Sequence, residues 1–520
     1  MIRHRVFHPL LLAAYPVLAL LAHNLDWLRP ISGLRALLIS VVGAWLLLIL
    51  LARVLHNWDR AGILVSLLVI LFYSYGQLYD SLRHALGLDL IRHRYLAPLY
   101  LAAAIALIWW IVKRLRRPES ATSVLNAMAL VVLAFPLFGM AEWTYSDLTT
   151  DRPPAQASTL KLPPGQPPDV YFLVVDGYAR QDTLLKVYDL DNTPFLTFLR
   201  DHGFYVADAA RSNYGQTGLS FSSSLNMDYV EELVSDLPHT AGRGVLWNLI
   251  KHSEVRRQLE SLGYETVAFS SGLAGTELTD ADTYYTAGGV DEDLGLVGIN
   301  PFEGMLIQTS LLRLPQDGVV ALPRFVPAAR FPYEVHRNRI RSIFARLKDL
   351  PETDKPKFVF AHIIAPHPPF VFAADGSPVT PTVPFTLRFT FDAGDPTQSD
   401  YVEGYRDQVL FVNDQLEEVI TTILAHSQAP PVIVLMGDHG PDSNSGRVNY
   451  VQERMTNLLA YHLPTRSEGL YPSVTPVNSF RIIFNQVFGG QYPILEDRAM
   501  YSEYDTPYDF QDVTDSIDPP

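Results

Sequence analysis

Acidic and histidine side chains stand just after short apolar runs of the sequence, where each run gives way to polar residues. The four such side chains are Asp176, His367, Asp438 and His439. A carboxylate oxygen beside an imidazole nitrogen, as in Asp438-His439, is a ligand pair for a divalent metal. Two plainer interpretations stay open. Asp438 could cap the next turn beside an exposed His439, and Asp176-Gly177 could be an ordinary turn.

A threonine stands at a predicted helix start. Thr217 ends the run Arg211–Thr217, and residues 218–226 are rich in small side chains that suit a buried helix. A threonine at such a place is commonly only the residue that caps the helix. The functional interpretation places its hydroxyl on a metal at the helix N-terminus. There the metal lowers the pKa of the hydroxyl, and free backbone N–H groups favour an anionic substrate.

Two further side chains are candidates for substrate contact. His367, in Ala-Pro-His-Pro-Pro, could donate a proton to a leaving alkoxide or hold a phosphate oxygen. Asn213 could donate to a developing oxyanion, although a turn residue is an equal interpretation. His362, in the middle of an apolar run, is expected to be a core histidine.

The elements that must position these residues alternate between strands and helices. Continuous apolar runs predict strands buried on both faces, and amphipathic segments between them predict helices. The predicted strands are 170–175, 266–269, 358–364 and 432–436, and the predicted helices are 193–203, 247–262 and 403–425. This alternation favours a doubly wound, mainly parallel α/β sheet, whose ligands bind beyond the carboxyl ends of the strands.

The first part of the chain is predicted to lie in a membrane. Its apolar stretches, each long enough to approach a span, lie near 7–23, 33–53, 61–79, 95–112 and 122–141. We therefore expect five transmembrane helices in a membrane domain at 1–142. If the N-terminus is cytoplasmic, the cytoplasmic segments contain more Lys and Arg than the segments on the other side, as the positive-inside rule requires. With five crossings, the residues after the last span then lie on the opposite side of the membrane.

Charge separates the two parts of the chain. Residues 1–150 hold 13 Lys and Arg against 7 Asp and Glu, whereas the whole chain has a net charge of −15. The later part is therefore strongly acidic, which argues against nucleic-acid binding. Prolines predict a linker at 143–168, followed by a catalytic domain at 169–490 and an acidic tail at 491–520 that packs as a strap or stays disordered.

Several of these segments resemble the sulfatase branch of the alkaline phosphatase superfamily. They are the strand that ends in Asp176-Gly177, the helix from Thr193 to Gly203, the turn from Asn213 to Thr217 and the turn Gly437–Gly440. Spans before such a domain resemble lipoteichoic acid synthases and phosphoethanolamine transferases. The resemblance implies that Asp176, Thr217, Asp438 and His439 hold one divalent metal, Zn²⁺ or Mn²⁺ rather than Mg²⁺, and that Thr217 is the nucleophile. It places His367 on the substrate side.

One departure from that family bears on the reaction. The chain has no Cys, and it has no Ser-x-Pro-x-Arg sequence that could mature to formylglycine. Sulfate-ester hydrolysis by that route is therefore disfavoured, and phosphorus chemistry through Thr217 is favoured.

The resemblance implies a multi-pass protein of the bacterial inner membrane whose catalytic domain lies on the periplasmic or extracellular side. We expect it to move a phospholipid headgroup to a glycan or lipid acceptor, or to water. Two alternatives remain at this point, namely a sulfatase-like phosphodiesterase or ester hydrolase, and a non-catalytic lipid-sensing member of the family.

Overall fold

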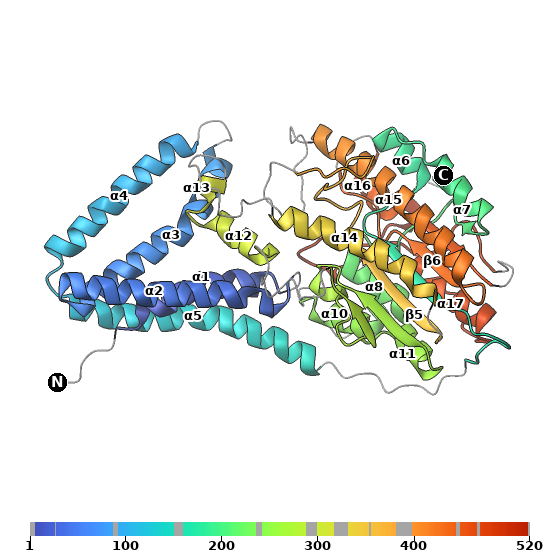
Figure 1. Cartoon of the computed structure of the whole chain (residues 1–520), viewed down its shortest axis with the longest axis horizontal. Helices are drawn as coiled ribbons and strands as arrows, with labels where there is room; N and C mark the ends of the chain where they lie inside the picture. Colours follow the sequence, from blue (N-terminus) through green and yellow to red (C-terminus); the bar gives the residue numbers. More distant parts are fainter. Residues whose placement is uncertain are drawn as a thin grey trace. The chain divides into compact units, whose positions relative to one another are not determined.

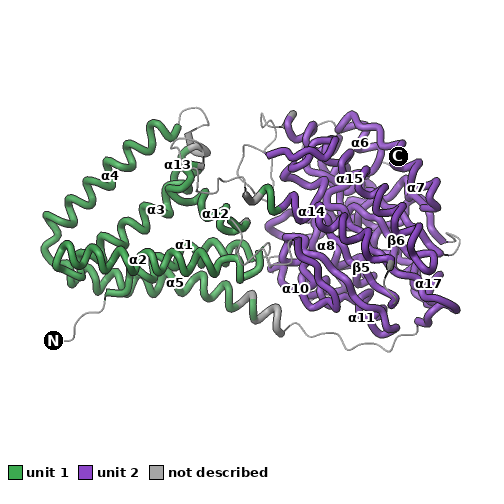
Figure 2. The backbone as a smooth tube through the Cα atoms, in the orientation of Figure 1, with its two compact units in different colours: residues 1–145, 291–335, 382–386 green, residues 146–290, 336–381, 387–520 purple. Residues whose placement is uncertain are grey.

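The structure is a computed structural model that divides into two compact units (Figure 2). It describes residues 6–25, 28–86, 92–149, 160–235, 242–287, 299–316, 331–352, 355–380, 398–443, 448–464 and 469–517. Unit 1 contains residues 1–145 and 291–335 with the short stretch 382–386, and unit 2 contains the remainder.

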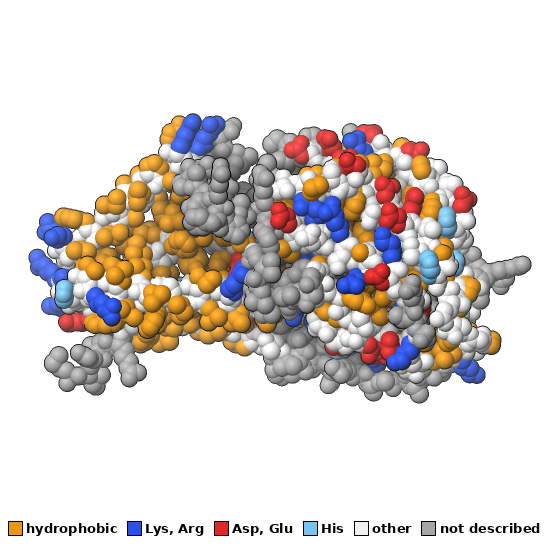
Figure 3. Space-filling view, viewed as in Figure 1, with side chains coloured by type: hydrophobic (Ala, Val, Ile, Leu, Met, Phe, Trp, Pro, Cys, Tyr) orange, Lys and Arg blue, Asp and Glu red, His pale blue; other side chains and the backbone are white. Residues whose placement is uncertain are grey.

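Long apolar helices make up most of unit 1 (Figure 1). They are α1 (His8–His23), α2 (Leu34–Leu55), α3 (Trp58–Leu86), α4 (His93–Arg114) and α5 (Pro118–Thr149). Side chains such as Leu99, Phe135 and Phe138 are exposed, and Figure 3 shows the helices of this unit covered with hydrophobic atoms. Such an exposed apolar surface is the pattern of helices that face lipid.

The number of spans differs from the expected five. Among the described residues, four helices are long and apolar enough to cross a membrane, at Pro30–Leu55, Trp58–Leu82, His93–Arg114 and Pro118–Ala141. The remaining apolar helix, α1, has 16 residues, which give about 24 Å of rise. That is short of a hydrocarbon layer of about 30 Å, so a fifth crossing remains a prediction.

The helix α1 packs into the bundle through small residues. Ala13 on α1, Ala44 and Ala52 on α2 and Ala61 on α3 belong to one buried cluster. Alanines let helix backbones approach closely, which is how helices associate where no hydrophobic effect drives them together.

A segment from the later part of the sequence also belongs to unit 1. The helices α12 (Pro301–Thr309) and α13 (Arg313–Gln316) lie within the predicted catalytic domain, yet they pack on the apolar helices. Phe302 and Leu306 share a buried cluster with α1 and its following turn. Arg313 Nη1 lies 2.6 Å from Asp80 Oδ2 on α3.

The sheet of unit 2 has seven strands in the order β2-β7-β6-β1-β5-β3-β4. The strands are β1 (Val170–Val175), β2 (Tyr205–Val206), β3 (Glu265–Phe269), β4 (Thr283–Tyr285), β5 (Lys357–Ile363), β6 (Val432–Met436) and β7 (Leu459–His462). The strands from β6 to β4 are parallel, while β7 is antiparallel to both of its neighbours. The sheet is therefore mixed and not purely parallel, because the antiparallel strand β7 and its neighbour β2 extend the expected parallel strands at one edge.

Helices cover the sheet, and every residue of β1, β5 and β6 is buried. The helices of unit 2 are α6 (Gln181–Tyr188), α7 (Thr193–Asp201), α8 (Thr217–Asn226), α9 (Val230–Leu233), α10 (Gly244–Lys251), α11 (Glu254–Ser261), α15 (Gln398–His426), α16 (Tyr450–Met455) and α17 (Pro476–Val487); α14 (Phe331–Asp349) begins in unit 1. Side chains of α8, α10, α11 and α17 form one core with the strands. The single helix expected over 247–262 is wrong, because Ser253 has an extended backbone between α10 and α11.

The acidic tail packs as a strap over residues 491–517. It forms the hairpin β8 (Met500–Tyr501) and β9 (Gln511–Asp512). The N–H of Met500 donates to the carbonyl of Asn213 at 2.8 Å, so the strap holds the loop before α8. The predicted linker at 143–168 begins inside α5, and its residues 150–159 lie outside the described part of the chain.

Candidate active site

Neighbouring parallel strands bring the two predicted aspartates together. Asp176 follows β1 and Asp438 follows β6, and these strands pair in the sheet. The N–H of Gly177 donates to Asp438 Oδ1 at 2.9 Å, and the N–H of His439 donates to the same oxygen at 3.0 Å. Gly177 has a φ of +72°, a left-handed conformation that glycine adopts without strain. One Asp438 oxygen is thus fixed by the backbone while the other stays available.

Thr217 is the first residue of α8, and two serines anchor this end of the helix. Ser212 Oγ and Ser220 Oγ donate to the main-chain carbonyl of Asp438 at 2.6 and 2.7 Å. Thr217 Oγ1 consequently lies 3.1 Å from Nε2 of His439. The helix therefore delivers the threonine hydroxyl to the carboxyl ends of the central strands.

The four predicted metal ligands meet at one point. Nε2 of His439 lies 3.3 Å from Asp438 Oδ2 and 3.8 Å from Asp176 Oδ1. Nδ1 of His439 lies 2.9 Å from the carbonyl of Gly440, so that nitrogen carries the proton and the lone pair of Nε2 faces the cluster.

The cluster fits a divalent cation. Asp176 Oδ1 and Asp438 Oδ2 are buried and make no hydrogen bond within the described structure. Buried carboxylate oxygens without partners are costly, and a cation between them removes that cost. Two carboxylates, a hydroxyl and a neutral imidazole are ligands suited to Zn²⁺ or Mn²⁺.

The electrostatics of the cluster agree with this interpretation. Burial and the neighbouring Asp176 carboxylate raise the pKa of Asp438. Burial raises the pKa of Asp176 as well, but the nearby His367, His362 and His439 outweigh it and hold that pKa below its ordinary value. Burial and the cationic Arg454 lower the pKa of His439, which keeps the imidazole neutral. A neutral imidazole is the form that binds metals.

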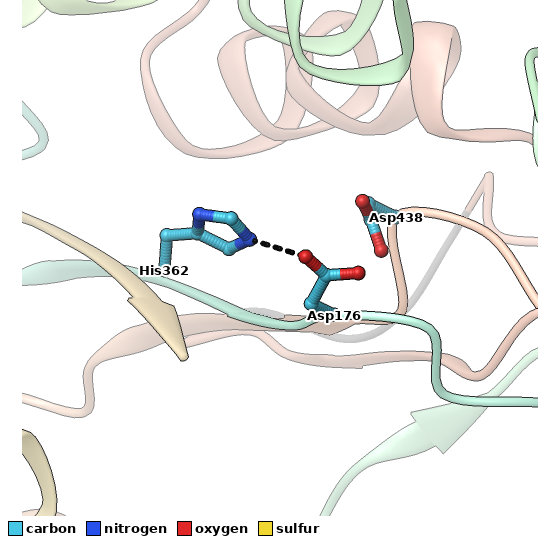
Figure 4. A group of neighbouring side chains, drawn as sticks. All are labelled: Asp176, His362 and Asp438. Carbon is cyan, nitrogen blue, oxygen red and sulfur yellow. Dashed lines mark ion pairs between the residues drawn. The ribbon is translucent and has the colours of Figure 1, made fainter. Parts of the chain in front are cut away.

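His362 was expected to be a core histidine, and it is indeed fully buried, but it lies beside the site. Its Nε2 is 3.3 Å from Asp176 Oδ2, and its Nδ1 is 2.9 Å from Thr276 Oγ1. Ligand atoms of Asp176, His362 and Asp438 all lie within 4.8 Å of one another, with Asp176 between the other two (Figure 4). The signal that could have revealed this is register, because His362 pairs with Val174, two residues before Asp176.

His367 lies beside the site, close enough to act electrostatically on Asp176. It is half-buried and lines a cavity of about 30 Å³ together with Gly177, Tyr401, Asp442 and Arg454. Its N–H donates to the carbonyl of Asp176 at 3.0 Å, which ties its loop to the end of β1.

The Asn213 side chain has a structural role and is not open to substrate. Its side chain is fully buried, Oδ1 accepts from the N–H of Val477 at 2.8 Å, and Nδ2 donates to the carbonyl of Arg498 at 2.8 Å. Both ends of the carboxamide therefore join the loop before α8 to α17 and to the tail strap. The structure does not bring this amide to the metal ligands.

The chain belongs to the sulfatase family, whose family model matches residues 168–465, more than half of the 520 residues. This confirms the resemblance drawn from the motifs. None of the curated proteins matches the sequence.

Among solved structures, the periplasmic domain of EptC from Escherichia coli in complex with Zn is 11% identical, with a TM-score of 0.43, and the match covers 69% of this chain and 98% of that one. The integral membrane phosphoethanolamine transferase EptA from Neisseria meningitidis is 15% identical, with a TM-score of 0.38, and the match covers 94% and 91%. A 2-O glycosaminoglycan sulfatase, BT1596, is 13% identical, with a TM-score of 0.37, and the match covers 63% of this chain and 71% of that one.

Proposed function

We propose that this protein is a membrane-anchored, metal-dependent phosphotransferase that moves a phospholipid headgroup to an envelope acceptor through Thr217. The observation that carries the proposal is the meeting of the Thr217 hydroxyl with His439, Asp438 and Asp176 at the start of a buried helix. A bound divalent metal would supply positive charge that lowers the pKa of this hydroxyl.

The chain's own residues account for the bonds made and broken. Thr217 Oγ1 attacks the phosphorus of the donor, and its proton leaves toward the neighbouring Asp438 carboxylate. The bond from phosphorus to the diacylglycerol oxygen breaks, and His367 gives that alkoxide a proton. An acceptor hydroxyl or water then gives its proton to His367 and attacks the phosphothreonine ester. The bond from phosphorus to Thr217 Oγ1 breaks, and this oxygen recovers its proton from Asp438.

The start of α8 suits a phosphorylated group. Its N-terminal residue Thr217 stands at the site, and the first N–H groups of a helix have no partner within that helix. These groups and the helix dipole favour a negative charge.

The packing of unit 1 supports a periplasmic placement of the catalytic domain. The segment α12–α13, which the sequence places within the later part of the chain, contacts the C-terminal ends of α1 and α3 and the start of α2. Met140 of α5 packs at the same end. With an inside N-terminus and five crossings, all these ends lie on the outer side. The linker at 143–168 and the domain at 169–490 then follow outside the membrane.

Unit 1 also contains a cavity that suits the acyl part of a lipid donor. The cavity has a volume of about 920 Å³ and lies between α2, α3, α4 and α13. Small and aliphatic side chains line it, including Gly43, Ala104 and Leu314, and Arg94 stands at the α4 start, where it can attract a lipid phosphate. We propose that acyl chains of the donor occupy it.

The experiment is a diacylglycerol-release assay with the full-length protein in vesicles of mixed bacterial phospholipids with Zn²⁺ or Mn²⁺. Mass spectrometry should detect diacylglycerol with the wild type and none with Thr217→Ala. Thr217→Ser is the matched control, because it keeps a hydroxyl. Full activity in Thr217→Ala would refute the nucleophile. Headgroup recovered free indicates hydrolysis, and headgroup recovered on an acceptor indicates transfer.

A further inference from the structure

Arg454, on α16, points its guanidinium at the cluster of predicted metal ligands. Nη2 lies 3.1 Å from Nε2 of His439, the same nitrogen that faces Thr217. Nε donates to the carbonyl of Gly215 at 2.7 Å, and Nη1 donates to the carbonyl of Gly440 at 3.0 Å. The two carbonyls fix the plane of the guanidinium. This orientation directs Nη2 toward His439.

A metal at the cluster removes the acceptor of that third contact. Nε2 of His439 has one lone pair, and a metal ligand uses it. Nη2 then has an N–H group without an acceptor, held beside a divalent cation. Arginine does not lose its proton to relieve this repulsion.

No carboxylate in the described part of the chain lies within 4.0 Å of this guanidinium. Asp442, which lines the same small cavity, is beyond that distance. The two buried carboxylates, Asp176 and Asp438, balance a divalent metal between them. The Asp442 carboxylate attracts the guanidinium from beyond hydrogen-bonding distance. Nη2 of Arg454 therefore lacks an acceptor, not a counter-charge, once a metal is bound, and the small cavity that Arg454 lines with His367 has room for one acceptor oxygen.

We propose that Arg454 binds a non-bridging oxygen of the substrate phosphate and selects a singly charged phosphodiester. This inference rests on the proposed function and specifies its substrate class. The Asp442 carboxylate already offsets much of the guanidinium charge, so it disfavours a second negative charge on the substrate. The charge-assisted hydrogen bond from Nη2 holds the phosphorus beside Thr217.

The test uses full-length protein in detergent and compares Arg454→Gln with Arg454→Lys. Arg200→Gln is the matched control, because Arg200 pairs with Asp208 at an exposed place on α7. Isothermal titration measures Zn²⁺ affinity in phosphate-free buffer, and then the affinity of the zinc-loaded protein for dimethyl phosphate. Thermal unfolding verifies that each variant is folded.

Loss of a like charge should make Arg454→Gln bind Zn²⁺ more tightly than the wild type. The same variant should bind dimethyl phosphate about 10-fold to 100-fold more weakly, the range for a hydrogen bond to a charged group. Arg454→Lys should keep the wild-type Zn²⁺ affinity and bind dimethyl phosphate with an intermediate affinity. These opposite shifts do not follow from a merely structural role.

Three outcomes contradict the inference. If both affinities fall together in Arg454→Gln, the residue only supports the fold of the site. If dimethyl phosphate affinity is unchanged, another group binds the anion. If wild-type protein prefers inorganic phosphate dianion to dimethyl phosphate, the charge argument is wrong. Failure of the wild type to bind Zn²⁺ or Mn²⁺ at all overturns the proposed function itself.

Discussion

The hydroxyl of Thr217 lies 3.1 Å from Nε2 of His439, although 222 positions separate the two residues in the chain. Thr217 begins α8 and His439 follows β6, and hydrogen bonds from Ser212 and Ser220 to the main chain of Asp438 hold the two segments together. The site is therefore a junction between one helix N-terminus and two neighbouring strand ends. The predictions below separate the chemistry of that junction from its support.

Asp438→Asn should raise the stability of the metal-free protein while abolishing its response to metal. Asparagine keeps the Oδ1 acceptor for Gly177 and His439, and it removes one of two buried carboxylates. In a chelator, we expect the unfolding temperature to rise by a few degrees, corresponding to about 1 kcal/mol. Added Zn²⁺ should stabilise the wild type and leave this variant unchanged in the same thermal scan. A lower unfolding temperature in chelator would show that repulsion between the carboxylates is not significant.

His362→Gln should weaken metal binding without removing a direct ligand of the predicted set. His362 contacts Asp176 from the side opposite Asp438, so its loss frees the Asp176 carboxylate to rotate. Partners that orient a metal ligand typically contribute about 10-fold to 100-fold in affinity. Competition against a coloured zinc chelator measures this change. A complete loss of zinc binding would instead indicate that His362 is itself a ligand. An unchanged zinc affinity would indicate that His362 is only a core residue.

Gly76→Ala should disturb the docking of α12 and α13 on α3. A Cβ atom at Gly76 would lie 1.8 Å from the backbone carbonyl oxygen of Gln308, which cannot move aside as a flexible side chain can. We expect destabilisation by at least about 2 kcal/mol, seen as a lower unfolding temperature and faster proteolysis within 299–316. Gly139→Ala is the matched control, because nothing lies within 4 Å of its added Cβ. Equal behaviour of the two variants would argue against this close packing.

Asn213→Ala should reduce stability before it affects chemistry. The substitution leaves the buried N–H of Val477 and the carbonyl of Arg498 without their partner, at a cost of about 1–3 kcal/mol. Thermal unfolding should therefore change, while diacylglycerol release per folded molecule should remain near the wild-type value. If activity falls and the unfolding temperature does not, Asn213 contacts substrate as the sequence suggested.

Much of the fold follows from local patterns. The strand Val170–Val175 and the strand Val432–Met436 begin and end where their apolar runs do, because continuous burial leaves no polar side chain to mark a different end. The prediction failed where structure depends on distant partners. β7 is short and largely buried, and it runs antiparallel to β6. The residues of β7 alone do not indicate this direction, because it depends on the pairing with β6.

The sequence by itself determined which side chains stand at strand ends and at a helix start, because hydrophobic periodicity is a local property of the chain. Periodicity placed Asp176, Asp438 and His439 after strands and Thr217 at a helix start, and the resemblance to the sulfatase branch implied that they hold a metal. Only the tertiary structure decided that His362 and Arg454 flank them, that the amide of Asn213 is used by Val477 and Arg498, and that residues 300–316 join the apolar helices. Such relationships depend on contacts between segments hundreds of residues apart, and packing of the whole chain, not spacing within one segment, sets those contacts.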